Sequence, residues 1–96
     1  MLPDGLKWAP RWEHAKFSNG LFLQGVLVAY VEERVNGTWM ARLWCHWPIE
    51  APLVMRDCRS MECGRHGCEI WAARHESRIR REVAAALSRR PRHRGV

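Results

Sequence analysis

The chain has 96 residues, a formal net charge of +6, six tryptophans and four cysteines. This length gives one domain with a single core and little stability to spare. No apolar run approaches the roughly 20 residues of a membrane span, and the start, MLPDGLKWAP, lacks the apolar segment of a signal peptide. Cysteines without an export signal favour a reducing compartment, so we expect a cytoplasmic protein with no membrane contact. The expectation of a bacterial host rests on the general style of the chain and not on this chemistry.

The positive charge is confined to the second half of the chain. Residues 1–55 carry five basic and five acidic side chains, whereas residues 56–96 carry eleven arginines and five acidic side chains. Arginine suits planar, bidentate contact with phosphate or carboxylate. The distribution indicates an anionic partner, although a GC-rich genome also favours arginine over lysine.

Residues 1–20 are rich in turn-forming residues and carry three large aromatic side chains, Trp8, Trp12 and Phe17. Their spacing is too irregular for a helix. We expect an ordered aromatic arm that packs on the rest of the domain and could include a short strand near Trp8 to Trp12.

Residues 21–47 are predicted to form a β-hairpin that turns at Asn36-Gly37, because Asn-Gly favours a two-residue type I′ turn. This turn would place Tyr30 opposite Leu43. One face would then form the core: Phe22, Val26, Val28, Tyr30, Trp39, Ala41, Leu43, Cys45 and Trp47. The other face would carry Leu27, Ala29, Val31, Met40, Arg42, Trp44 and His46.

After the hairpin, Pro48 and Pro52 interrupt the strand, and residues 53–59 could form a short third strand. Ser60 is a good helix N-cap, and the apolar residues that follow recur at intervals of three and four. Gly64 and Gly67 either allow this helix to approach the sheet closely or belong to a loop before it.

The predicted fold class is α+β. A small antiparallel sheet, made of the hairpin 21–47 and a possible third strand at 53–59, packs against one long C-terminal helix over about 61–88. Residues 1–88 form the single domain, with residues 1–20 as its aromatic arm. The basic tail, residues 89–96, is predicted to be disordered.

Four potential zinc ligands lie close together in the sequence: Cys58, Cys63, His66 and Cys68. Thiolate and imidazole are the ligands that zinc prefers. If the segment is helical from Ser60, however, Cys68 lies well round the helix from Cys63, and one tetrahedral site is hard to build. The alternative is that Cys45 and Cys68 are small core residues. No cofactor is expected other than zinc in the first case.

Candidate catalytic groups are few. Cys45 and His46 are neighbours on a strand and point to opposite faces, so they cannot act as a thiol nucleophile and its base. Asp occurs at only two positions, and no phosphate-binding glycine loop can be placed. We therefore do not expect an enzyme.

The candidate binding residues form two groups. On a helical wheel, Arg74, Arg78 and Arg81 form one stripe beside the apolar face, and such a stripe suits phosphate or an acidic protein surface. The alternative is a solvated helix face with a solubilising tail. Arg42, Trp44 and His46 lie on the outer hairpin face, and Trp and Arg are frequent interface anchors. The alternative there is that the N-terminal arm covers this face.

The segment Trp39-Met40-Ala41-Arg42-Leu43, followed by a third strand and by Ser60-Met61-Glu62 at a helix start, resembles AP2-type and phage-integrase arm-binding domains. The likeness covers residues 25–75. It implies a three-stranded sheet, packed on one helix, that reads the DNA major groove. The prolines near the third strand and the early helix glycines depart from that pattern.

The whole chain also resembles the small accessory proteins of phages and prophages, which are short, tryptophan-rich and built from a β-hairpin and a helix. Some of these are anti-CRISPR proteins, which inhibit host defence. This resemblance implies an inhibitor that acts by stoichiometric binding to a host protein or nucleoprotein complex. A DNA- or RNA-binding module is the alternative, and a zinc-stabilised structural module is the third.

Overall fold

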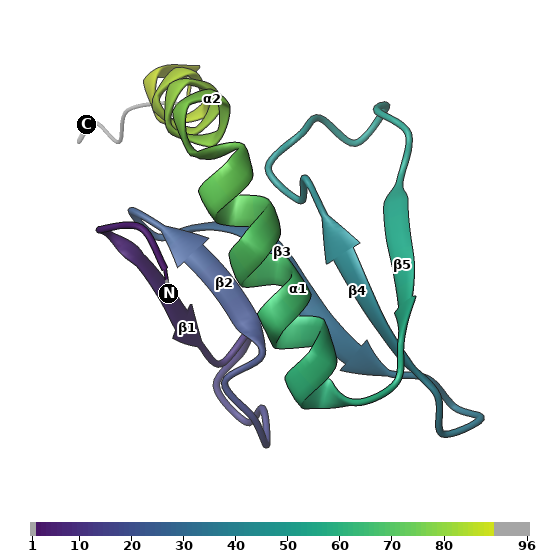
Figure 1. The fold of residues 1–96 in the computed structure, drawn as a ribbon. Coiled ribbons are helices and arrows are strands. Elements are labelled where there is room, and N and C mark those ends of the chain that lie inside the picture. The colour runs from purple at the N-terminus through teal and green to yellow at the C-terminus, as the bar shows by residue number, and fades with distance from the viewer. Residues whose placement is uncertain (1, 90–96) are drawn as a thin grey trace.

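The computed structural model describes residues 2–89, which form five strands followed by two helices (Figure 1). The strands are β1 (Leu6–Ala9), β2 (Gly20–Leu23), β3 (Val26–Glu33), β4 (Trp39–Leu43) and β5 (Val54–Cys58), and the helices are α1 (Met61–Arg74) and α2 (Glu76–Arg89). The sheet order is β1-β2-β3-β4-β5, and each strand pairs antiparallel with the next. The predicted α+β class is confirmed, but the sheet is larger than the hairpin with one extra strand.

The predicted first strand of the hairpin is in fact two strands. Gln24 and Gly25 have φ values of 52° and 78°, and the chain reverses there between β2 and β3. Two consecutive residues with positive φ are what a two-residue hairpin turn requires. Residues 1–20 likewise are more than an arm, because they contribute β1 to the sheet.

The turn at Asn36-Gly37 is present, but its connection is one residue longer than predicted. Gly37, with φ of 87°, donates its N–H to the Arg34 carbonyl, and Arg34 N–H donates to the Thr38 carbonyl. The loop therefore has three residues, and its last residue is the left-handed Gly37. As a result Tyr30 faces Arg42, and the predicted pairing with Leu43 is wrong.

A β-bulge explains which half of the predicted core face was right. The register between β2 and β3 shifts by one residue, so that Val28 is extra and both Val28 and Ala29 are buried. Before the bulge, Val26 and Val28 face the core as predicted. After it the faces exchange, so Val31 is buried and Tyr30 lies on the outer face.

The predicted single helix is broken at His75. The Ser60 side chain accepts a hydrogen bond from Cys63 N–H at 3.1 Å, which confirms the predicted N-cap of α1. A methyl group at Gly64 would lie 2.8 Å from a Val31 methyl, so this glycine allows α1 to approach β3 closely. In Figure 1, α1 crosses the sheet diagonally, and α2 turns away so that it is viewed almost along its axis.

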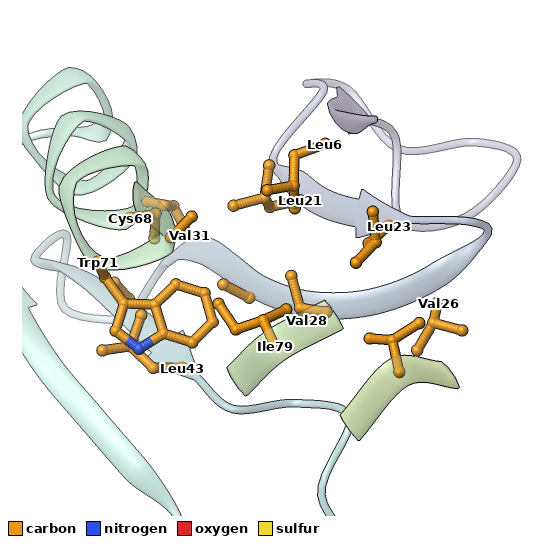
Figure 2. Packing of buried hydrophobic residues seen from close by; sticks show 14 residues of the cluster. Leu6, Leu21, Leu23, Val26, Val28, Val31, Leu43, Cys68, Trp71 and Ile79 are labelled. Atoms are coloured by element: carbon orange, nitrogen blue, oxygen red, sulfur yellow. The ribbon is translucent and has the colours of Figure 1, made fainter. Parts of the chain in front are cut away.

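The core lies between α1 and the sheet and extends under the start of α2. Leu21, Val28 and Ile79 are fully buried in it (Figure 2). Val83 is a second buried residue that α2 adds to the core. No helix within residues 2–89 is long and apolar enough to cross a lipid bilayer. The predicted disorder of the tail concerns residues 90–96, which lie outside the described part, whereas Arg89 ends α2.

Candidate functional site

Seven side chains meet where α1 joins α2 and where the chain leaves β4. We call them the junction cluster: Trp44, His46, Trp47, Trp71, His75, Arg78 and Glu82. Trp44 has a φ of 59°, which turns the chain at the end of β4 and interrupts the strand alternation. Trp44 and His46 therefore do not form an outer surface with Arg42, as the sequence suggested.

Aromatic contacts hold the break between the two helices. The Trp44 ring stacks on Trp47 with centroids 4.8 Å apart, and it packs edge-to-face against Trp71 at 5.0 Å and His75 at 5.2 Å. Offset-stacked and edge-to-face arrangements are the favourable ones for aromatic rings. We attribute the turn between α1 and α2 to this insertion of Trp44 beside the last turn of α1.

The Glu82 carboxylate is the polar centre of the junction cluster. Its Oε1 lies 2.8 Å from His46 Nε2 and accepts a hydrogen bond from Trp47 Nε1 at 3.0 Å, and its Oε2 accepts one from Arg78 Nε at 2.8 Å. Burial raises the pKa of this carboxyl, but the hydrogen bonds from Arg78, His46 and Trp47 outweigh burial and lower the pKa from 4.5 to about 2. Glu82 therefore stays ionised at all physiological pH values.

The His46–Glu82 pair looks like part of a catalytic site, but its surroundings favour a structural role. Only 1% of the His46 side chain is exposed. The adjacent thiol of Cys45 donates to the Arg42 carbonyl, and burial raises its pKa to about 11. A thiol with so high a pKa is protonated near neutral pH and is a weak nucleophile.

A groove of about 710 Å³ lies on the helix-bearing face of the sheet, between α1 and strands β4 and β5. We call it the α1–β5 groove. Its lining is Ala41, Leu43, Arg56, Asp57, Cys58, Arg59, Cys63, Gly64, Gly67, Cys68, Ile70, Trp71, Arg74 and His75. A volume of this size is typical of binding sites in proteins.

The predicted arginine stripe is brought together at the start of α2. Arg74, Arg78 and Arg81 all line a shallow hollow of about 350 Å³, and Arg74 and His75 also line the α1–β5 groove. The groove and the hollow are therefore contiguous. We call their five arginines, Arg56, Arg59, Arg74, Arg78 and Arg81, the arginine surface.

The arginines of this surface differ in how free they are. Arg78 is held by Glu82, and its guanidinium lies 4.7 Å from the centroid of the Trp44 ring. Arg74 and Arg81 are exposed and make no ion pair with any residue of the 2–89 segment. Arg78 thus supports the fold, while Arg74 and Arg81 are available to a partner.

Arg42 belongs to a different face. It lies on the outer side of the sheet between Tyr30 and Met55, and its Nε is buried without a hydrogen-bond partner. Arg11 from the N-terminal segment lies over Tyr30 at 3.6 Å and pairs with Glu32 at 2.6 Å. The alternative that the N-terminal aromatics cover this face does not hold for Trp8, which faces α1 and donates to Glu69 at 2.9 Å.

The four residues of the zinc hypothesis are not gathered into one site. Cys58, Cys63 and Cys68 line the α1–β5 groove, whereas the exposed His66 is not part of its lining. Within the part of the chain that the structure describes, no three His, Cys, Asp or Glu side chains are arranged to hold one metal ion. Burial raises the pKa of Cys58, and it raises that of Cys68 to about 12, so without a metal ion both thiols are protonated near neutral pH.

Sequence reasoning missed Arg56 and Arg59, which line the α1–β5 groove. Arg56 shares the helix-bearing face of β5 with Val54 and Cys58, so its alternation with Met55 and Asp57 was the available indication. Comparison with protein-family models, curated proteins and solved structures finds no match for this chain.

Proposed function

We propose that this chain is a small, non-enzymatic, basic binding protein that acts by stoichiometric binding to a host protein or nucleoprotein complex. The phage-encoded inhibitors that it resembles, anti-CRISPR proteins among them, act in this way. The observation that carries the proposal is the arginine surface, because five guanidinium groups surround one contiguous groove and hollow.

The local charge balance supports an anionic partner. Two acidic residues, Asp57 and Glu76, line the groove and the hollow, and both are already paired with arginines outside this surface. Asp57 lies 2.8 Å from Arg34, and Glu76 lies 2.8 Å from Arg80. Of the five arginines only Arg78 is paired, with Glu82, among the interactions of residues 2–89, so the other four keep their positive charge. Such a surface accelerates encounter with an acidic partner.

The junction cluster supports the same proposal because it fixes the position of α2 relative to the sheet. Glu82 and Trp44 tie the start of α2 to the end of β4, so the hollow beside α2 keeps its position relative to the groove. A surface that is ordered before binding loses less conformational entropy when the complex forms. This favours binding of a preformed shape over folding on the partner.

A DNA- or RNA-binding module is the second candidate, and one observation favours it. Arg74, Arg78 and Arg81 converge on one hollow, and clustered guanidinium groups also suit phosphates. The two functions separate in a salt titration. Binding to nucleic acid weakens log-linearly with salt, by about 0.9 decades per phosphate contact for each decade of salt on B-DNA.

The test is capture of partners from a bacterial host lysate with the wild type and with the double variant Arg74→Glu/Arg81→Glu. Both side chains are exposed and unpaired within residues 2–89, so the variant should fold normally. The amount of partner that it captures should be lower than with the wild type by about tenfold or more. Lys16→Glu/Arg89→Glu is the matched control, since it changes the charge equally at exposed positions outside the arginine surface. Undiminished capture by the first variant would contradict the proposal.

A further inference from the structure

The helix layer covers only part of the sheet. In Figure 1, α1 lies diagonally over the middle of the sheet, and β5 is left at the open side. Gly64 of α1 packs against Val31 of β3, whereas the α1 residues Cys63, Gly67, Ile70 and Arg74 face the α1–β5 groove. These four are spaced by three and four residues and so form one stripe along α1.

α1 contacts β3 and β4 and, to a lesser extent, β5, so the groove lies towards the β5 edge of the sheet. Neighbouring strands are about 4.8 Å apart, so β5 lies about 10 Å from β3, and packed helices are separated by about 8–10 Å. Because α1 lies over β3 and β4, a second helix beside it would have its axis near β5, at the edge of the sheet. A methyl group at Gly67 would meet nothing within 4 Å, so this part of the α1 wall is open.

The groove has an apolar floor and a basic rim. Ala41, Leu43 and Trp71 form buried parts of the floor, and Ile70 on the α1 wall is 47% exposed. Arg56 and Arg59 stand on the β5 side, and Arg74 stands on the α1 side. Their only acidic neighbour in the lining, Asp57, is paired with Arg34 at 2.8 Å.

From this arrangement we propose that the α1–β5 groove binds one amphipathic helix of a partner protein, which lies alongside α1. Its apolar stripe would cover the floor and Ile70, and acidic residues on its two flanks would face Arg56 and Arg59 on one side and Arg74 on the other. The inference rests on the proposed function, since this helix would be the recognition segment of the partner.

The chemistry of the groove favours this occupant over others. A nucleic-acid backbone would meet the arginines but would leave the apolar floor without a matching surface. A second copy of this chain would offer α2 or α1 as the bound helix. α2 has four arginines and two glutamates, and α1 has two of each, so neither has the net negative charge that would match the basic rim. The chain's own residues 90–96 carry three arginines and no acidic residue, so they are repelled by the rim.

The test uses displayed peptides of about 14 residues, the length of α1, built as amphipathic helices with either acidic or basic flanks. They are selected against the immobilised full chain, and the selected sequences are measured as fluorescein-labelled peptides by fluorescence polarisation. We expect acidic flanks to be enriched and the Kd to be micromolar. Recovery of no binder, or of binders with basic flanks, would overturn the proposal.

Two variants locate the binding in the groove. Ile70→Asp should raise the Kd of the selected peptide by about tenfold or more, and Arg59→Glu should raise it by about three- to tenfold. Their matched controls are Ile49→Asp, at a residue that is 95% exposed outside the groove, and Lys16→Glu in the connection from β1 to β2. Circular dichroism and thermal unfolding establish that all four variants fold. Equal binding by the groove variants and their controls would place the peptide elsewhere and overturn the proposal.

The alternatives give different results. Displacement of the peptide by short double-stranded DNA at moderate salt, or a dimeric mass that Ile70→Asp converts to a monomer, would assign the groove to nucleic acid or to a second copy and overturn the proposal. Failure of the groove is also separable from failure of the proposed function. If Ile70→Asp leaves the capture of host partner intact while Arg74→Glu/Arg81→Glu removes it, the binding function stands and the groove assignment falls.

Discussion

The two ends of the helix layer are built in opposite ways. Where α1 joins α2, Trp44 fills the angle between the helices, and Glu82 accepts hydrogen bonds from three side chains. Beside β5 the sheet is uncovered, and the side chains there are an exposed isoleucine and arginines without acidic partners in the lining. Aromatic and arginine residues alone therefore do not identify a binding surface. Such residues are available to a partner only where the protein does not already supply their stacking, hydrogen-bond or ion-pair partners.

Removing the Glu82 carboxylate should give the largest effect on stability. Glu82→Leu leaves the buried His46 ring and the Trp47 N–H without their acceptor, and we expect the free energy of unfolding to fall by about 3 kcal/mol. Glu76→Leu is the matched control, because it removes an exposed i,i+4 pair with Arg80 and should change stability by less than about 1 kcal/mol. Urea unfolding followed by circular dichroism measures both. Equal losses would mean that the junction is no more tightly built than the solvated side of α2.

The pH dependence of stability should carry the signature of the same carboxylate. Folding lowers the pKa of Glu82 from 4.5 to about 2, so its contribution is complete above pH 4.5 and is lost as the pH falls from about 4.5 towards 2. We expect the stability difference between wild type and Glu82→Gln to shrink by about 2 kcal/mol across this window, after allowance for the 26% exposure of the side chain. Denaturant unfolding at a series of pH values measures it. A constant difference would show that the hydrogen bonds to Glu82 are not formed in solution.

The smallest effects are expected from two glycines of α1, one packed against β3 and one on the open side that faces the α1–β5 groove. Gly64→Ala places a methyl group 2.8 Å from Val31 and should destabilise the protein by about 1–2 kcal/mol, because α1 must move away from β3. Gly67→Ala meets nothing within 4 Å and should stabilise it by up to about 1 kcal/mol through helix propensity. Thermal unfolding of the two variants should therefore show shifts of opposite sign. Shifts of the same sign would mean that α1 is rotated from the orientation described here.

Local chemistry in the sequence predicted the local features well. The Ser60 cap, the left-handed Gly37 and the span of the helical region each depend on residues close in the chain. The turn at Gln24-Gly25 was missed because Gln rarely adopts positive φ, so Gly25 alone did not indicate a two-residue hairpin turn. Because this turn was not predicted, the prediction had one long strand in place of β2 and β3. The pairing of β1 with β2 could then not be predicted either.

The faces of the sheet could be predicted only in part. A one-residue bulge at Val28 changes the side to which Tyr30 and Val31 point, and alternation alone does not locate a bulge. The helix break at His75 also has a tertiary cause, since the ring that occupies the angle comes from Trp44. Trp44 and His46 were predicted to bind a partner. They lie against the helices instead, Trp44 on His75 and His46 on Glu82.

The order of the five strands has a consequence for biosynthesis. Every strand pairs with its neighbour in sequence, so each ladder closes over a connection of 2 to 10 residues. Local closures of this kind lose less chain entropy than distant ones and form faster. Since the N-terminal part of a chain leaves the ribosome first, we expect the five strands to pair before α1 and α2 are complete. The two helices would then dock onto a sheet whose strands are already paired.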